Sequence, residues 1–201
     1  TIALSIGGIL GLLAALRHGT WFDTLVMGLS VSGLSIPTFW MGLLLILLFS
    51  VRLKLFPSIS TGSSPADLFL PALTLGLPEA AVVARMVRAS MLDVLGREYI
   101  TTARAKGLPE RLVIFKHALR NALIPVVTFV GLQMAYLLGG ATIVETMFAR
   151  QGIGRLAVQS IYSRDYPVVQ GVVLVTAAIY VLINTLTDIT YVFLNPKIRL
   201  K

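Results

Sequence analysis

Apolar residues fall into five long runs that are separated by short polar stretches. A helix needs about 20 mainly apolar residues to cross the ~30 Å hydrocarbon core of a bilayer, because it rises only ~1.5 Å per residue. The run 1–16 is shorter than this, and the run 68–92 is interrupted by Glu79, Arg85 and Arg88. The pattern nevertheless predicts an all-α, polytopic membrane protein with five transmembrane helices, at 1–16, 25–51, 68–92, 121–144 and 166–194.

The composition supports a membrane protein. Of the 201 residues, 56% are hydrophobic and 13% are charged, whereas soluble domains are about 45–50% apolar and about 25% charged. This argues against a water-soluble enzyme and excludes a disordered chain. The net charge of +8 suits a membrane surface better than a nucleic acid, because the basic residues stand between apolar runs. Without cysteine, the chain has neither a disulfide framework nor a thiolate metal site.

The basic residues predict the orientation of these helices, because Lys and Arg accumulate in short cytoplasmic loops. Alternate loops carry twelve Lys and Arg on one side of the membrane and five on the other. The side with twelve, which includes 93–120 and the basic tail 195–201, is predicted to be cytoplasmic, and the turn-rich loop 58–65 to lie outside. Residue 1 then starts at the outer face. A chain with a cytoplasmic N-terminus is therefore expected to have one further helix before it, six in all.

The cytoplasmic segment, residues 93–120, is too polar to cross the bilayer but is strongly patterned. A helix is predicted from about Arg97 to Lys106, ending at Gly107, with Pro109 in the first turn of a second helix. In that second helix one apolar face is predicted, formed by Leu112, Phe115, Leu119 and Ala122. On the residues alone, an amphipathic hairpin lying on lipid headgroups explains this pattern equally well. A DNA-binding helix-turn-helix does not fit a segment tethered at both ends to membrane helices.

Several longer strings carry a family resemblance. They are TTARAKG at 101–107, FKHALRNALIP at 115–125, LPALTLGLP at 70–78, ARQGIGRLAVQSIYSRDYPVVQG at 149–171 and NPKIRL at 195–200. Together they resemble the inner-membrane permease subunits of ABC importers, in particular the B-type subunit of the oligopeptide/dipeptide/nickel family, over essentially the whole chain. The general importer loop has Glu-Ala-Ala, three residues and then Gly; Thr101, Thr102 and Ala103 stand in its first places. No ion pair built on that glutamate is therefore expected.

The resemblance implies a type I ABC importer permease fold in the bacterial cytoplasmic (inner) membrane. It implies as partners a homologous C-type permease subunit, two ABC ATPase subunits, an extracytoplasmic substrate-binding protein and membrane lipid, but no nucleic acid. ATP and Mg would be used by the ATPase subunits, because this chain has no Walker-type phosphate loop and is not expected to be an enzyme or to bind a cofactor or metal. The residues implied to dock in the ATPase groove are Thr101, Thr102, Ala103, Arg104, Ala105, Lys106, Gly107 and Leu108. Arg104 and Lys106 are expected to meet acidic groups at its rim, and Ala103 and Ala105 to allow close approach.

Ionisable residues inside the runs are candidates for function by default. Glu79, directly after Pro78, is a candidate to face the pathway and contact a substrate amine; the alternative is a carboxyl bonded to its own helix. Ser35 and Pro37 mark a bendable stretch suited to a gate or to ordinary packing. Further residues have structural interpretations: Arg85 and Arg88 reach headgroups or hold the cytoplasmic segment, and Asp188 is hydrogen-bonded beside Asn184 and Tyr191.

The outer loop 145–165 is where the resemblance places the binding protein, with Arg150, Arg155, Arg164 and Asp165 as contacts. Small peptides are the expected substrates, dipeptides or oligopeptides; nickel, as a chelate, is the alternative. An ion-coupled secondary transporter is a further alternative that needs intramembrane carboxylates. An intramembrane serine hydrolase does not fit, because both histidines fall in predicted cytoplasmic loops.

Overall fold

The computed structural model describes residues 1–59 and 64–194, and this part of the chain is helical with no strand. The elements in chain order are η1 Ala3–Gly7, α1 Gly8–Leu16, α2 Trp21–Ser35, α3 Thr38–Leu45, η2 Ile46–Arg52, η3 Pro65–Leu68, α4 Phe69–Leu95, α5 Glu98–Ala105, α6 Glu110–Leu112, η4 Val113–Leu119, α7 Arg120–Met147, α8 Ile153–Tyr162 and α9 Tyr166–Leu194. The basic tail 195–201 and residues 60–63 of the predicted outer loop lie outside the described residues.

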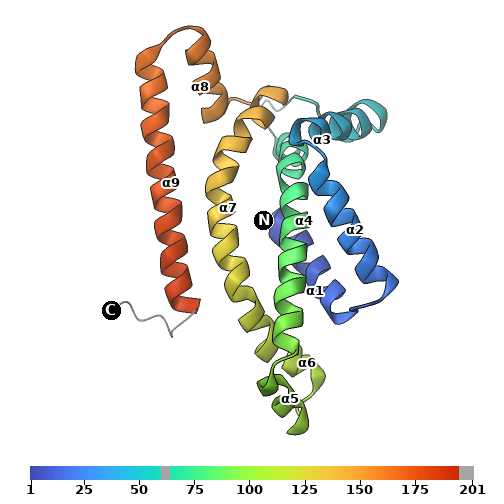
Figure 1. Ribbon diagram of the computed structural model, residues 1–201. Coiled ribbons are helices and arrows are strands. Elements are labelled where there is room, and N and C mark those ends of the chain that lie inside the picture. The colour runs from blue at the N-terminus through green and yellow to red at the C-terminus, as the bar shows by residue number, and fades with distance from the viewer. Residues whose placement is uncertain (60–63, 195–201) are drawn as a thin grey trace.

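The ends of the helices alternate between the two ends of the bundle. The α1–α2 turn, the α5–α6 unit and the Leu194 end of α9 lie toward one end of the bundle, and α3 and α8 lie toward the other (Figure 1). The first end carries residues 93–120, which the sequence predicts to be cytoplasmic, and we call it the cytoplasmic end on that prediction. Among the described residues, three helices have the length and composition to cross a bilayer: Pro65–Leu95, Glu110–Met134 and Tyr166–Thr190.

The predicted span over 25–51 is broken at the stretch that its sequence marks as bendable. The chain turns by 105° between α2 and the helix formed by α3 and η2, so this pair counts as one span only if a broken span is allowed. Ile36, with φ −86° and ψ 121°, is extended rather than helical, because a following proline disfavours helical geometry. The next residue, Pro37, has ψ 140° and completes the break. The first run is also a shorter apolar helix, Ala3–Leu16, so the structure has three or four candidate spans in place of five.

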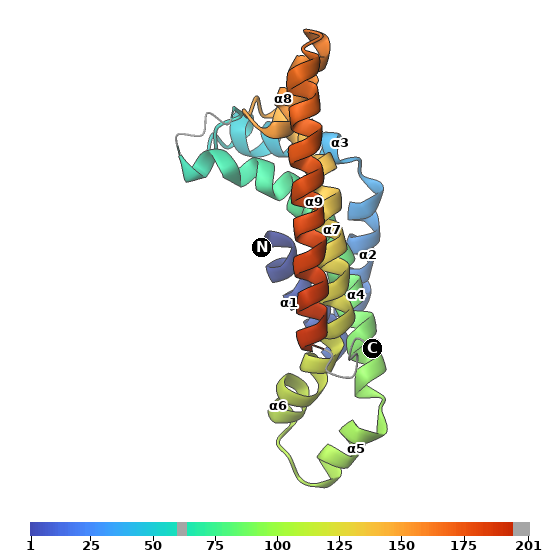
Figure 2. The ribbon, with the colours of Figure 1, turned by 90° about the vertical axis from the view of Figure 1, so that its left-hand side faces the viewer.

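Helix α4 lies at the centre and packs against α1, α2, α3 and α7. Its approach to η1 and α1 is close because small residues face each other: a Cβ at Gly7 of η1 would overlap the carbonyl oxygen of Ala80, and a Cβ at Gly11 of α1 would overlap that of Ala84. Small residues four apart on two helices are how membrane helices bring their backbones together. Figure 2 shows the first part of α4 lying across the outer end while the rest runs along the bundle, and the proline inside this helix is Pro78, which removes a backbone hydrogen bond.

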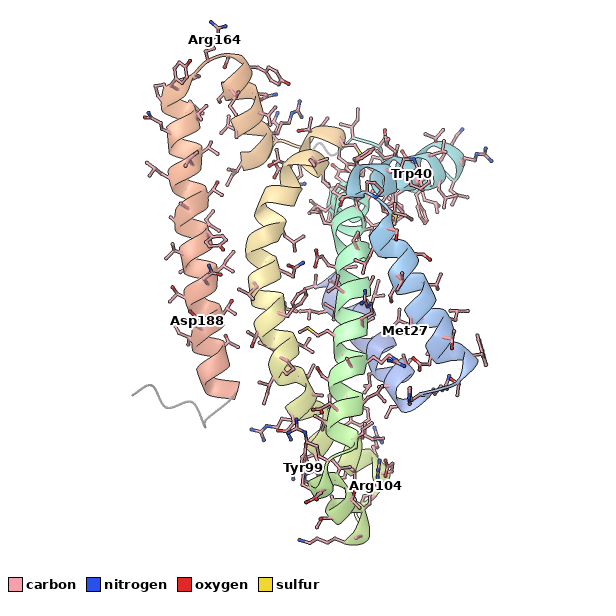
Figure 3. All side chains as sticks on the ribbon, in the orientation of Figure 1. Met27, Trp40, Tyr99, Arg104, Arg164 and Asp188 are labelled. Atoms are coloured by element: carbon pink, nitrogen blue, oxygen red, sulfur yellow. The ribbon has the colours of Figure 1, made fainter. Side chains whose placement is uncertain are left out.

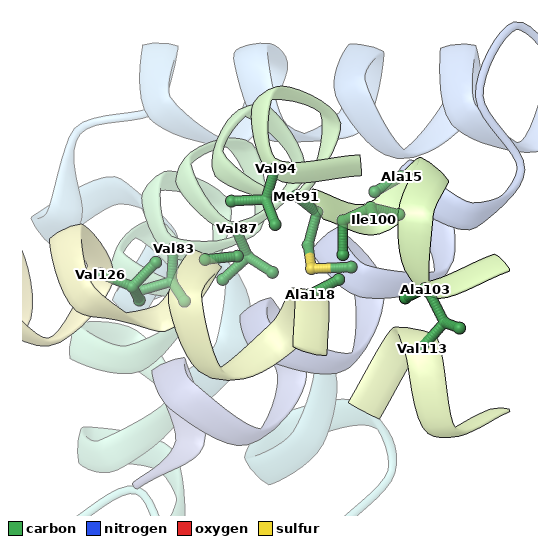
Figure 4. Close-up of a cluster of buried hydrophobic side chains, with 11 residues drawn as sticks. Ala15, Val83, Val87, Met91, Val94, Ile100, Ala103, Val113, Ala118 and Val126 are labelled. Atoms are coloured by element: carbon green, nitrogen blue, oxygen red, sulfur yellow. The ribbon is translucent and has the colours of Figure 1, made fainter. Parts of the chain in front are cut away.

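Two apolar clusters hold the bundle at its ends. The outer cluster joins α3, α4 and α7 through Leu45, Leu70, Val144 and Phe148. The larger one joins α1, α4 and α7 to the cytoplasmic segment (Figure 4) and contains Ala15, Val83, Val87, Met91, Val94, Ile100, Ala103, Val113, Ala118, Ala122 and Val126. The cytoplasmic segment therefore shares one core with the membrane helices.

Candidate functional site

The cytoplasmic segment forms a corner between α5 and α6, as its sequence predicts. Helix α5 ends at Ala105, and the amide of Gly107 donates to the carbonyl oxygen of Arg104 at 2.9 Å. Gly107 has a φ of +76°, the left-handed region that glycine enters without steric cost. Pro109, with ψ 137°, then precedes the first residue of α6. The turn therefore depends on Gly107 and has a defined geometry.

An ion pair closes this corner. The guanidinium of Arg104 donates from Nε to Glu110 Oε2 at 3.1 Å and from Nη2 to Oε1 at 2.6 Å. These hydrogen bonds raise the pKa of Arg104 and lower the pKa of Glu110. Both side chains are about half exposed, so the ion pair adds little to the stability of the fold. Its two hydrogen bonds instead fix the orientation of α5 relative to α6. Arg104, expected to meet acidic groups of an ATPase, thus already has a carboxylate partner within its own chain.

Helix α5 packs against the rest of the molecule through buried side chains. Ile100 is fully buried and Ala103 is 8% exposed, both in the larger apolar cluster with Val113. Asn121 of α7 donates to the hydroxyl oxygen of Tyr99 at 3.2 Å. The expectation that Ala103 faces an ATPase is therefore wrong, because its small side chain allows α5 to pack against its own core.

The predicted apolar face of the second helix is right for two of its four residues: Ala122 is buried in the larger apolar cluster and the partly buried Leu119 packs against it, but Leu112 and Phe115 do not join it. Leu112 and Phe115 are 37% and 53% exposed, whereas Val113 and Ala118 are fully buried. The reason is local geometry: Val113–Leu119 is π-helical, so its hydrogen bonds join residues five apart instead of four, and the buried pair Val113 and Ala118 has that spacing. Leu112 and Phe115 consequently point away from the core.

The exposed surface of the corner is polar at its tip. Apart from Ala103 and the half-buried Leu108, the residues that the resemblance places in an ATPase groove are exposed: Thr101, Thr102, Arg104, Ala105, Lys106 and Gly107. Figure 3 shows Tyr99 and Arg104 at this end of the molecule, beyond the ends of the long helices. The tip is therefore accessible to another protein.

A buried ion pair that the sequence did not reveal lies above the corner. Arg88 of α4 donates from Nε to Asp23 Oδ1 at 2.5 Å and from Nη2 to Oδ2 at 2.7 Å. Asp23 is 3% exposed, also accepts from the amide of Gly19 at 3.1 Å, and has Nδ1 of His18 at 3.1 Å. Arg88 therefore holds α2 to α4 and does not extend to headgroups. An acid in the first turn of α2 and an arginine inside another apolar run were the signals available in the sequence.

Glu79 bonds to a different helix from its own. Nε2 of Gln133 in α7 donates to its Oε2 at 2.8 Å, and both side chains are half-buried. Gln133 lies inside the apolar run 121–144. Because its side chain is uncharged, a search for charged residues inside the runs does not find it. Glu79 and Gln133 thus form a polar contact between the two long helices that flank the cytoplasmic segment.

The four pathway candidates do not gather at one place. The hydroxyl of Ser35 donates to the carbonyl oxygen of Val31 within α2, and Pro37 is exposed at the break after this helix. Pro78 is half-buried in α4. The apolar groove beside α2 is lined on α4 by Leu77, Ala80, Ala81 and Ala84, which lie on the helix face opposite the Glu79 contact with α7.

The outer loop is built around Glu145. Its carboxylate accepts from the amide of Arg155 at 2.9 Å in the first turn of α8, and negative charge is favourable at a helix N-terminus. Gly152 leaves room for this carboxylate. The guanidinium of Arg155 also donates to the carbonyl oxygen of Ala149, so Arg155 is half-buried and tied to its own loop.

The other outer-loop candidates differ in exposure. Arg150 is half-buried, whereas Arg164 and Asp165 are exposed. Figure 3 shows Arg164 at the tip of the turn between α8 and α9, where its φ is +58°. Asp165 also accepts from the amide of Val168 at 3.3 Å, at the start of α9.

Comparison with known proteins identifies relatives of the whole chain. The model of the family described as "Binding-protein-dependent transport system inner membrane component" matches residues 7–200. The chain is 49% identical over 199 residues to the glutathione transport system permease protein GsiC of Pectobacterium atrosepticum, covering 99% of this chain and 65% of the relative. It is 48% identical to the protein of the same name from Escherichia coli strain K12 and 47% identical to that from Shigella flexneri serotype 5b, with the same coverage. The chain thus spans just under two thirds of the length of these relatives.

Proposed function

Since the chain belongs to the family of binding-protein-dependent transport system inner membrane components, we propose that it forms half of the pathway of an ATP-driven importer for small peptides. A homologous permease subunit supplies the other half, two ABC ATPase subunits bind at the cytoplasmic end, and an external binding protein delivers the substrate. ATP and Mg²⁺ bind to the ATPase subunits and not to this chain.

The observation that carries the proposal is the rigid corner between α5 and α6. The turn at Gly107 is closed by the Arg104–Glu110 ion pair, and Ile100 and Ala103 fix α5 in the core shared with α4 and α7. A displacement of the exposed tip by an ATPase is therefore passed to both long helices, because a packed core transmits strain instead of absorbing it. A hairpin lying on headgroups needs no such core.

The Arg88–Asp23 ion pair extends this transmission to α2. Arg88 lies on α4 two turns before its end, and its two hydrogen bonds reach a carboxylate that is almost fully buried. Movement of the cytoplasmic end of α4 therefore carries the start of α2 with it. The proposed gate at Ser35 and Pro37 lies at the other end of the same helix.

Glu79 is the proposed contact for a substrate amine inside the membrane. Its Oε2 accepts from Gln133, while the second carboxylate oxygen remains available for an ammonium group. Small peptides are cationic at their amino end, and glutathione, which the relatives are named for transporting, is itself a small peptide with a free amine. On the outer face, the exposed Arg164 and Asp165 are the proposed contacts of the binding protein, whereas the half-buried Arg150 and Arg155 are not.

Uptake by whole cells tests this function. Cells that lack this subunit but keep its transporter partners should not accumulate labelled dipeptide or glutathione, and the full-length subunit should restore uptake that stops on ATP depletion. Restored uptake of nickel without peptide would keep the ATP-driven importer and replace its substrate. Uptake that survives ATP depletion and collapses with a protonophore would overturn the proposal in favour of an ion-coupled secondary transporter.

A further inference from the structure

Helix α9 carries a carboxylate on a surface that the other described residues, 1–59 and 64–165, do not cover. Asp188 is exposed, and among the described residues it has no hydrogen-bond or ion-pair partner. None of the membrane-spanning window Tyr166–Thr190 is buried within this chain. Figure 3 shows Asp188 between the two ends of α9 and not at a terminus.

The packed side of α9 is a different one. Thr187 lies so close to Gly131 of α7 that a Cβ there would overlap its side chain, and Val172 and Ile183 are half-buried on the same side of α9. Asp188 is rotated from Thr187 by about 100° around the helix axis. Its carboxylate therefore faces away from the contact with α7.

Other polar residues share the side of Asp188. Asn184 precedes it by one turn and is half-buried, and Gln170 precedes it by 18 residues, about five turns, and is exposed. We call Gln170, Asn184 and Asp188 the polar face of α9. By contrast, the exposed threonine Thr185 donates its hydroxyl to the carbonyl oxygen of Val181 and is satisfied within the helix.

Lipid is a poor cover for this face. A carboxylate against hydrocarbon is costly, and ionisable residues in membrane helices almost always face other protein or a water-filled cavity. Asp188 lies six residues before Leu194, about 9 Å along the axis. The short aspartate side chain does not span that distance to headgroups at the helix end. A cover with hydrogen-bond donors inside the membrane is therefore required.

We propose that the polar face of α9 binds the second permease subunit, and that a membrane helix of that subunit presents an arginine, lysine or amide donor to Asp188. This rests on the proposed function, which requires such a subunit. A carboxylate in the membrane pairs with donors of this kind, and the exposed Gln170 and Asp188 leave this side of α9 available to such a partner.

Purification of the complex tests the proposal. The full-length chain is co-expressed with its own second permease subunit and ATPase subunits, and the amount of second subunit retained per tagged chain is measured in detergent. Asp188→Leu should weaken the association about tenfold, because it leaves the donor of the partner unpaired, while Asp188→Asn should retain most of it. Thr185→Leu is the matched control: it also places a leucine on this side of α9, one turn away, but the Thr185 hydroxyl is satisfied within the helix, so no donor of the partner is left unpaired and the ratio should change little.

The outcomes separate the alternatives. If Asp188 faces lipid, Asp188→Leu should retain the second subunit and transport normally, because leucine is more compatible with lipid than aspartate. That result would overturn the proposal. Retention of the subunit with loss of transport would also overturn it and assign Asp188 to a water-filled pathway. If the wild-type chain itself retains no second permease subunit, the proposed function fails and not this interface alone.

Discussion

Arg88 and Asp23 are 65 positions apart in the chain, yet the guanidinium of one meets the carboxylate of the other through two hydrogen bonds of 2.5 and 2.7 Å. Asp23 accepts as well from the amide of Gly19, which joins the α1–α2 turn to the same group. The contact places a charge pair at the cytoplasmic end of three helices. Because Asp23 is almost completely buried, its charge depends on Arg88 for compensation.

Replacing Arg88 with methionine should therefore destabilise the protein by about 3 kcal/mol, since removal of one partner leaves a buried charge uncompensated. The double variant Asp23→Asn with Arg88→Met should recover part of that loss, because the orphaned charge is gone. Arg85→Met is the matched control: Arg85 stands one turn earlier on α4 and is exposed. Thermal unfolding in detergent measures all three. Equal effects of the Arg85 and Arg88 variants would show that the ion pair does not hold the helices.

Much of the architecture follows from hydrophobicity and charge. The helical class, the alternation of helix ends and the turn at Gly107 depend on residues within one or two turns of each other, and a chain pattern contains that information. The break at Pro37 shows the limit of a hydropathy window, which registers apolar length but not the extended conformation of Ile36. The π-helical turn at Val113–Leu119 is a second limit, because an α-helical period assigns Leu112 and Phe115 to the buried face of this segment and not Val113 and Ala118.

The polar contacts of the candidate site were the least accessible to sequence reasoning. The sequence pattern suggests a partner protein as the source of the carboxylate for Arg104. The structure shows that Glu110, only six residues away across the turn, supplies it. Gln133 was overlooked as the partner of Glu79 because it is uncharged. Such pairs depend on the rotation of each helix about its own axis. Tertiary packing determines that rotation, and a single sequence does not specify it.

The corner at Gly107 should depend on backbone conformation alone. A Cβ at this residue would meet no atom of this chain within 4 Å, so a substitution there does not crowd the corner itself. Gly107→Val should abolish transport while the protein remains in the membrane, because a β-branched residue is strained at a φ of +76°. Gly107→Asn should retain transport, since asparagine tolerates this region. Normal uptake with valine would mean that the corner bears no force.

Gly96 offers a control for that prediction. It ends α4 with a φ of −81°, and the nearest atoms to a Cβ are 3.7 Å away. Gly96→Ala should therefore fold and transport like the wild type, although it lies in the same cytoplasmic segment.

The two glycines of the outer loop should differ in their tolerance of alanine. A Cβ at Gly154 would lie 2.7 Å from the Cα of Thr142, and a backbone atom cannot move without shifting α8 from α7. The three atoms nearest to a Cβ at Gly152 all belong to the side-chain carboxylate of Glu145, which can rotate away at the expense of its hydrogen bond to Arg155. Gly154→Ala should thus lower the unfolding temperature more than Gly152→Ala, with Gly171→Ala, which meets nothing, as the neutral reference. The reverse order would contradict the packing of α8.

The contact between Glu79 and Gln133 separates a structural role from substrate recognition. Glu79→Gln keeps an oxygen that accepts from Gln133 at 2.8 Å, so the stability should change little, but the negative charge for a substrate amine is lost. Uptake of peptides with a free amino end should then need a substrate concentration about tenfold higher for half-maximal rate, whereas peptides acetylated at that end should show no such change.

Gln133→Leu keeps the carboxylate but removes its donor, and should cost about 1–3 kcal/mol of stability. Concentration-dependent uptake and thermal unfolding, measured side by side on both variants, distinguish the two roles. Equal loss of both peptide types in Glu79→Gln would restrict Glu79 to holding α4 against α7.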